Sequence, residues 1–136
     1  MAETVAFELV SPEELLLSED VAMVVVPGEE GDFGVLPRHA PLISSVRAGV
    51  ISVYKNERHT LSERIFVAGG FAEVTAERCT VLAELAVPVD RIDRAETEQR
   101  LKDAREDLAD ARDETARTAA RREISLRETM LKIAGS

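Results

Sequence analysis

"GDFGVLPRHAPLI", residues 31–43, brings together two glycines, two prolines and one of the two histidines of the chain. It overlaps the turn signal "PGEEGD", which follows the apolar run "VAMVVV". Pro37 and Pro41 fix φ, so this segment loses little conformational freedom when it binds a partner. Such a segment is typical either of an active-site loop or of a shaped contact surface, and the rest of the chain decides between them.

An enzyme centred on His39 would use this histidine as a base, flanked by Arg38 and Asp32. Nucleophilic catalysis also needs a positioned nucleophile, and no Ser or Cys accompanies His39 in a recognisable motif. The second histidine, His59, lies in the polar turn "KNERHTLS", and two isolated histidines without partners at ligand spacing do not indicate a metal site. We therefore expect no catalytic residue and no metal ligand.

The composition is that of a small globular protein. The 136 residues carry a net charge of −9 and are 45% hydrophobic but only 4% aromatic, so the core is expected to be mainly aliphatic. An acidic chain lacks the clustered bases that bind a nucleic-acid backbone, and no apolar run approaches the roughly 18 residues of a spanning helix. We expect neither nucleic acid as a partner nor direct membrane insertion. The single cysteine, Cys79, is predicted to be a small buried strand residue.

The sequence predicts two domains, residues 1–88 and residues 89–136, because its pattern changes near Pro88. The first part holds all five prolines and alternates short apolar runs with turn residues, as in "TVAFELV", where Val5, Phe7 and Leu9 occupy every second position. Further strands are predicted in "VAMVVV", "GVISVYK", "RIFVAGGFAEV" and "CTVLAELAV". Many short strands at close spacing favour an antiparallel β-sandwich or barrel. The glycine pair Gly69–Gly70 is interpreted as a bulge or a tight strand crossing.

Residues 90–133 are rich in strong helix formers and contain no proline or glycine. One helix of this length would extend about 66 Å, so a two-helix hairpin is the more economical prediction. Its turn is placed within residues 109–115, where Asp and Thr can cap a second helix. The last helix is the only basic element, because residues 115–136 hold five bases and two acids. Its bases can pair with the acidic first helix or reach an acidic surface on another subunit, and the two interpretations are not exclusive.

Two stretches of the first part resemble signatures of the epsilon subunit of F-type ATP synthases. In "PGEEGDFGVLPRHAPLISSVRAGVISV" a glycine-flanked acidic turn precedes the pattern G-[hydrophobic]-[hydrophobic]-P-x-H-A-P-L. In "FVAGGFAEVTAERCTVLAELA" a Gly-Gly pair leads into a threonine- and valine-rich strand. The order of the parts also agrees, so the resemblance covers essentially the whole chain.

The resemblance implies a sandwich of about ten strands followed by a two-helix hairpin, in a non-catalytic rotor subunit that links gamma to the c-ring. It implies a location on the cytoplasmic face of the bacterial plasma membrane, as a peripheral part of the complex. The positions that correspond to c-ring contacts are Glu30, Gly31 and Asp32. Those that correspond to gamma contacts are Arg38, His39 and Pro41. The opening stretch is therefore interpreted as a contact surface.

In this family the hairpin can extend toward the catalytic alpha and beta subunits and hinder ATP hydrolysis, which makes Arg121, Arg122 and Arg127 the candidate inhibitory contacts. Some members also bind ATP through the motif [I/L]-D-x-x-R-A. The nearest match is "VDRIDRAE", where Arg94 and Ala95 fit but Asp90 is displaced by one position. ATP is thus expected as a weak regulatory ligand at most, and no cofactor is required. The alternative from another class is a free-standing small-molecule binding module that uses the sandwich as a cup.

Overall fold

The computed structural model describes residues 3–135. Contacts within the chain divide it into two units, Met1–Pro88 and Val89–Ser136. The first unit contains the strands β1 (Val5–Val10), β2 (Leu15–Val21), β3 (Met23–Gly28), β4 (Gly31–Val35), β5 (Leu42–Ser45), β6 (Gly49–Tyr54), β7 (Glu63–Val74) and β8 (Arg78–Pro88). The second contains the short 3₁₀ helix η1 (Val89–Arg91) and the helices α1 (Arg94–Asp110) and α2 (Glu114–Ala134).

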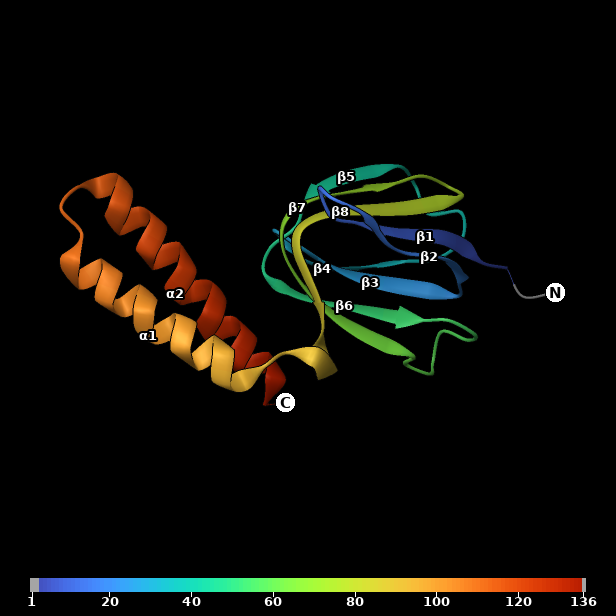
Figure 1. Cartoon of the computed structure of the whole chain (residues 1–136). Coiled ribbons are helices and arrows are strands. Elements are labelled where there is room, and N and C mark those ends of the chain that lie inside the picture. The colour runs from blue at the N-terminus through green and yellow to red at the C-terminus, as the bar shows by residue number, and fades with distance from the viewer. Residues whose placement is uncertain (1–2, 136) are drawn as a thin grey trace. The chain divides into compact units, whose positions relative to one another are not determined.

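The strands form a sandwich because the two long strands, β7 and β8, pass through both of its layers (Figure 1). Neighbouring strands follow the order β2-β1-β8-β7-β6-β3-β4, and β5 pairs with β7 beside this path. The first half of β7 pairs with β6, and its second half pairs with β5. The sheet therefore bends over within β7 and β8, and its two parts face each other.

Two features of the strands differ from the sequence prediction. The described residues contain eight strands rather than about ten, because the remaining connections are turns. The sandwich is also not purely antiparallel, since β1 and β8 run in parallel. Parallel neighbours need a long connection, and nearly the whole sandwich lies between these two strands in the sequence. Strands β2, β4 and β5 were not predicted. Strands β2 and β5 contain few buried side chains, and β4 falls within the stretch that was interpreted as a contact surface.

The glycine pair makes the bend possible by permitting a close approach of two backbones. Gly69 and Gly70 have φ of +72° and +96°, values that disfavour any residue with a Cβ. A Cβ on Gly70 would lie 1.8 Å from the carbonyl oxygen of Leu82. The register of β7 with β8 is the same on both sides of the pair, since Ala68 faces Leu85 and Gly70 faces Ala83. The prediction of a tight crossing is therefore confirmed, whereas no extra residue forms a bulge between these strands.

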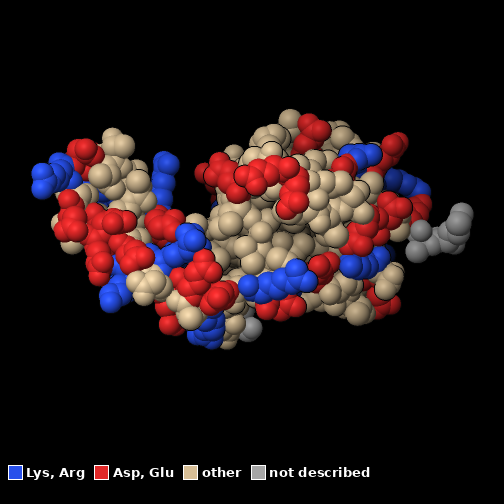
Figure 2. Space-filling model, viewed as in Figure 1, with Lys and Arg blue, Asp and Glu red and all other residues tan. Residues whose placement is uncertain are grey.

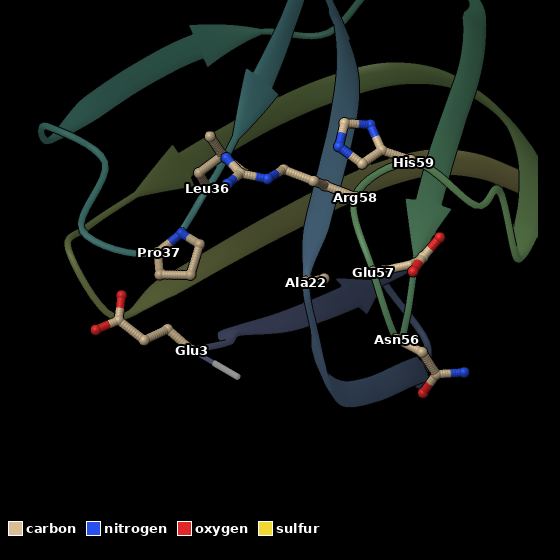
Figure 3. A pocket seen from close by; sticks show the side chains of 8 residues that line it. All are labelled: Glu3, Ala22, Leu36, Pro37, Asn56, Glu57, Arg58 and His59. Atoms are coloured by element: carbon tan, nitrogen blue, oxygen red, sulfur yellow. The ribbon is translucent and has the colours of Figure 1, made fainter. Parts of the chain in front are cut away.

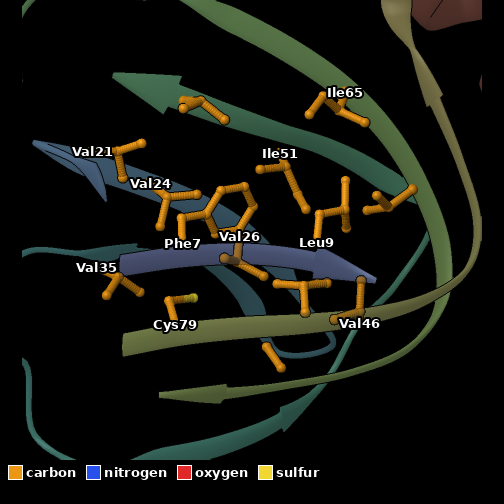
Figure 4. Packing of buried hydrophobic residues seen from close by; sticks show 14 of the residues in the cluster. Phe7, Leu9, Val21, Val24, Val26, Val35, Val46, Ile51, Ile65 and Cys79 are labelled. Atoms are coloured by element: carbon orange, nitrogen blue, oxygen red, sulfur yellow. The ribbon is translucent and has the colours of Figure 1, made fainter. Parts of the chain in front are cut away.

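The core cluster between the two layers is aliphatic apart from Phe7 and Cys79, and Phe33 packs against it (Figure 4). Phe66 is also fully buried. Val5, Phe7 and Leu9 are buried while the residues between them are only partly so, as the alternation in β1 predicted. Cys79 is fully buried in β8, which confirms its predicted place. Burial raises the pKa of its thiol to about 12, so it stays protonated and unreactive at neutral pH.

The helical unit is a hairpin whose short turn lies within the predicted range, because α1 ends at Asp110 and α2 begins at Glu114. Both helices begin at an aspartate whose carboxylate accepts a backbone N–H: Asp93 from Glu96 at 3.0 Å and Asp113 from Ala116 at 2.8 Å. Few side chains of this unit are buried, namely Thr97, Leu101, Ala104, Ala120 and Met130. The helices are therefore defined mainly by local sequence.

Candidate interaction surfaces

The acidic turn, defined here as residues 29–32, consists of the connection between β3 and β4 and the first two residues of β4, and it holds the three predicted c-ring contacts. Glu30 and Gly31 are exposed, and Gly31 has φ of +139°. The backbone N–H of Glu29 donates to the carbonyl of Ser45 at 2.9 Å. The turn is thus a fixed projection whose outermost charges belong to Glu29 and Glu30.

Arg47, which no sequence pattern identified as a site residue, holds the acidic turn. Its guanidinium donates from Nη2 to Oδ1 of Asp32 at 2.5 Å and from Nη1 to the carbonyl of Gly28 at 2.5 Å. Its backbone N–H donates to the carbonyl of Pro27 at 3.0 Å. The third predicted contact, Asp32, is therefore already paired within the protein. The only signal for Arg47 in the sequence was an arginine flanked by strand residues. Nothing near it indicated its partner, because Asp32 lies 15 positions away.

The proline loop, residues 36–41, holds the three predicted gamma contacts. Arg38 has φ of +67° and is the one non-glycine residue with positive φ in residues 3–135, which marks a locally strained backbone. Its N–H donates to the carbonyl of Ala76 at 2.7 Å, and its side chain pairs with Glu3. His39 is half-buried and donates from Nδ1 to the carbonyl of Ala40 at 2.6 Å, while Pro41 is exposed.

The two predicted contact groups lie at opposite ends of β4. From Asp32 to Val35 the extended strand covers about 10 Å, and the proline loop follows it. Asp32 is bound to Arg47, so the structure does not bring it to His39. The arrangement needed for catalysis by His39 is not formed, and the two groups are separate surfaces.

A shallow pocket of about 490 Å³ adjoins the proline loop (Figure 3). It is lined by Glu3 and Ala22, by Leu36 and Pro37 of the proline loop, and by residues 56–59 of the connection between β6 and β7. Residues 56–59 are exposed and include Glu57, Arg58 and His59. Ligand sites are usually concave and mostly apolar, so this exposed polar lining does not favour the small-molecule binding alternative.

An apolar row crosses the outer side of the layer that contains β1, β8, β7 and β5. Phe71, Leu82 and Val10 are successive partners on three neighbouring strands. Ile43 stands two residues before Ser45, the partner of Phe71, and so belongs to the same side. Ile43 is 70% exposed and Phe71 is 47% exposed. Exposed apolar side chains gathered in this way indicate a protein interaction surface.

Lys55, the residue after β6, links β2 and β7 through two carboxylates. Its Nζ lies 3.3 Å from Oε1 of Glu19 in β2 and 3.3 Å from Oε2 of Glu63 in β7. Hydrogen bonds to Glu19 and Glu63 raise the pKa of Lys55 above its ordinary value. The cluster joins strands of the sandwich and has a structural role.

The bases of α2 are paired mostly within their own helix. Arg121 lies 3.4 Å from Glu114, and Arg127 lies 2.6 Å from Glu123 with its side chain only 13% exposed. Arg122 makes no ion pair within residues 3–135. The pair that joins the two helices, Arg105–Glu128 at 4.0 Å, has its base on α1 and its acid on α2. The interpretation that the α2 bases neutralise the acids of α1 is therefore wrong. Charges of both signs are intermixed over this unit (Figure 2).

The three positions that correspond to the nucleotide motif lie around the start of α1. Asp90 belongs to η1, whereas Arg94 and Ala95 form the first turn of α1, and all three are exposed. No ion pair joins Asp90 to Arg94 in the described part of the chain. Asp93, the other carboxylate of this segment, is occupied as the N-cap of α1.

Within residues 3–135 there is neither a membrane-spanning helix nor a cluster of metal ligands. None of the helices in residues 3–135 is long and apolar enough to cross a membrane. Over the same residues, no three of the His, Cys, Asp and Glu side chains are grouped so as to hold a metal ion.

Comparison with known proteins gives matches over the whole chain. The family described as "ATP synthase, Delta/Epsilon chain, beta-sandwich domain" matches residues 4–89. The ATP synthase epsilon chain of Rhodospirillum centenum is 52% identical over 100% of this chain and 95% of its own length. That of Rhodospirillum rubrum is 52% identical over 96% of each chain, and that of Maricaulis maris is 48% identical over 98% of each chain.

Two solved structures share the fold at low sequence identity. A chain of the Euglena gracilis mitochondrial ATP synthase OSCP/F1/c-ring structure matches with a TM-score of 0.79 and 24% identity, over 98% of this chain and 82% of its own length. A chain of the Tetrahymena thermophila mitochondrial ATP synthase central stalk and c-ring structure matches with a TM-score of 0.68 and 15% identity, over 97% of each chain.

Proposed function

Because this chain belongs to the family of ATP synthase epsilon chains, we propose that it is a non-catalytic rotor subunit of a bacterial F-type ATP synthase. It takes part in ATP synthesis coupled to proton transport by linking the gamma subunit to the c-ring. The bacterial relatives named ATP synthase epsilon chain match this chain over nearly their full length, which supports this role for the whole chain.

The observation that carries the proposal is that one sandwich has two contact surfaces of different chemistry. The apolar row offers Ile43 and Phe71 to a protein partner by burial of apolar area. The acidic turn offers Glu30 to a polar or basic partner. A subunit that connects two different proteins needs such a pair of surfaces.

Each surface has one proposed partner. The acidic turn, with Glu30, Gly31 and Asp32, meets the polar loops of the c-ring. The proline loop leads directly into β5, so Pro41 and Ile43 are close in the chain, and gamma covers both the loop and the apolar row. In this proposal Arg38 and His39 set the shape of the loop, since their polar groups are bound to Glu3, Ala76 and Ala40.

The helical unit is proposed to inhibit ATP hydrolysis by reaching the alpha and beta subunits. Arg122 is the first candidate contact because it has no ion pair within residues 3–135, whereas Arg121 and Arg127 must leave Glu114 and Glu123 to bind elsewhere. In this proposal ATP is a weak regulatory ligand at most, which is supported by the lack of an ion pair between Asp90 and Arg94 within residues 3–135. The protein is peripheral on the cytoplasmic face of the plasma membrane, as part of the complex.

The test is reconstitution of an ATP synthase from which the epsilon chain has been removed. We expect the full chain to restore ATP synthesis driven by a proton gradient and to lower ATP hydrolysis. A chain that ends at Pro88 should restore synthesis but leave hydrolysis uninhibited. If the full chain binds neither gamma nor the c-ring, the proposed function is wrong; if both forms restore synthesis and neither inhibits, only the role of the helices is wrong.

A further inference from the structure

We infer that Arg47 is a positioning residue for the contact between the acidic turn and its partner: it fixes the turn so that Glu30 is presented in one orientation. The inference rests on the proposed function, because it concerns the surface assigned there to the c-ring. It assigns a role to a side chain that itself need not touch the partner.

The first support is the number of separate links from Arg47 to the segment around the turn. Nη1 binds the carbonyl of Gly28 and Nη2 binds Asp32, both at 2.5 Å, so one planar guanidinium spans the two ends of the turn. Its backbone N–H binds Pro27 at 3.0 Å. Arginine suits this position because its donors form a rigid fork, whereas a lysine is a single point charge.

The second support is where Arg47 stands in the fold. It lies in the corner, residues 46–48, between β5 and β6. The N–H of Val46 donates to the carbonyl of Gly70 at 3.0 Å, which ties this corner to the bend of β7. The acidic turn is therefore attached to the strand that passes through both layers, rather than to its own hairpin alone.

The third support is the charge that remains at the tip. Arg47 neutralises Asp32, while no ion pair involves Glu29 or Glu30 in the described residues. Glu29 and Glu30 are then the unpaired charges of the turn, and the two guanidinium hydrogen bonds of Arg47, which we call the clamp, hold them in place. Loss of Arg47 would leave two acceptors without their donor and let the turn move, with little effect on the buried core.

Amide hydrogen exchange in the full chain tests the clamp directly. We expect Arg47→Gln to raise the exchange rate of the Glu29 amide, which donates to Ser45, by about tenfold, while amides of β8 keep their rates. Arg58→Gln removes the same charge from an exposed loop residue that forms no ion pair within residues 3–135. This variant should change neither the exchange rate of the Glu29 amide nor those of the β8 amides. Equal protection of Glu29 in the Arg47→Gln variant and the parent chain would overturn the inference.

Binding of the full chain to detergent-solubilised c-ring tests the consequence. We expect Glu30→Gln and Arg47→Gln each to weaken binding by roughly threefold to tenfold, and the double variant to be weaker by much less than the product of the two changes. Arg47→Lys should restore only part of the affinity. Additive effects would mean that Arg47 does not act through the turn, and the inference would be wrong.

The two failures can be told apart. If Glu30→Gln leaves c-ring binding unchanged, the proposed contact of the turn is wrong, and the exchange measurement still decides whether Arg47 fixes the turn. If Arg47→Gln does not fold, Asp32→Asn replaces it. This variant keeps an acceptor for Arg47 but loses the charge, so we expect a smaller increase in the exchange rate of the Glu29 amide.

Discussion

The sandwich and the helical hairpin are held together in different ways. In the sandwich, the ion pairs join separate strands or loops, as Lys55 does with Glu19 and Glu63. In the hairpin, the ion pairs described lie within one helix, with the exception of Arg105–Glu128. The sandwich also has a continuous buried core, whereas the hairpin buries few side chains.

This difference separates a fixed shape from an adjustable one. Strands far apart in the sequence cannot leave one another without exposing the core of the sandwich. The helices keep their caps and their i,i+4 pairs whatever their mutual arrangement, because these interactions are local. The connection between them, residues 111–113, contains no glycine or proline that would impose a particular turn. The same chain thus combines a rigid contact platform with an element suited to rearrangement.

The largest expected effect comes from replacing one buried side chain in each unit by alanine. Phe7→Ala, at a fully buried site in the sandwich, should lower the free energy of unfolding by about 3–5 kcal/mol. Leu101→Ala, in the hairpin, should cost about 2 kcal/mol because its surroundings can collapse more readily. Urea unfolding followed by circular dichroism measures both. Equal losses would show that the hairpin is packed as tightly as the sandwich.

The next largest effect is expected at Gly70, where the sandwich bends. Gly70→Ala should cost about 2–3 kcal/mol, since φ of +96° is strained for alanine and the new Cβ meets the carbonyl of Leu82 at 1.8 Å. Gly34→Ala is the matched control, because the nearest atom to its new Cβ is Sδ of Met23 at 3.9 Å. Thermal unfolding compares the variants. A Gly70→Ala protein as stable as the control would remove the reason given for the bend.

A cap in the hairpin offers a local change of intermediate size. Asp113→Ala removes the acceptor of the Ala116 N–H and should destabilise α2 by about 1 kcal/mol. Amide exchange should accelerate in the first turn of α2 and stay unchanged in the strands. Asp113→Asn keeps a capping oxygen and should behave as the parent chain. Acceleration in the strands as well would contradict the local character of the hairpin.

The smallest effect is the pH dependence of the Lys55 cluster. Because the folded state raises the pKa of Lys55 above 10.5, its contribution to stability is complete below that pH and is lost as the pH rises through the folded value. Lys55 is 38% exposed, so screening keeps the contribution below about 1 kcal/mol. The difference in unfolding midpoint between the parent chain and Lys55→Met should shrink between pH 9 and pH 12. A difference that stays constant would mean that the charge of Lys55 does not stabilise the fold.

Local patterns in the sequence predicted what local interactions determine. The alternation of Val5, Phe7 and Leu9 identified β1, and the change of composition near Pro88 separated sandwich from helices. The parallel pairing of β1 with β8 could not be predicted, because register depends on residues some 70 positions apart. Arg47 was missed for the same reason, since nothing near it in the sequence identifies Asp32 and Gly28 as its partners.

The passage of β7 and β8 through both layers has a mechanical consequence. In a sandwich of separate strands, the layers resist sliding only through the side chains between them. Here a tangential load on one layer reaches the other along covalent backbone, and Gly69–Gly70 lies between the part of β7 that pairs with β6 and the part that pairs with β5. A part placed between a turning shaft and a ring would lose little angular motion to internal shear.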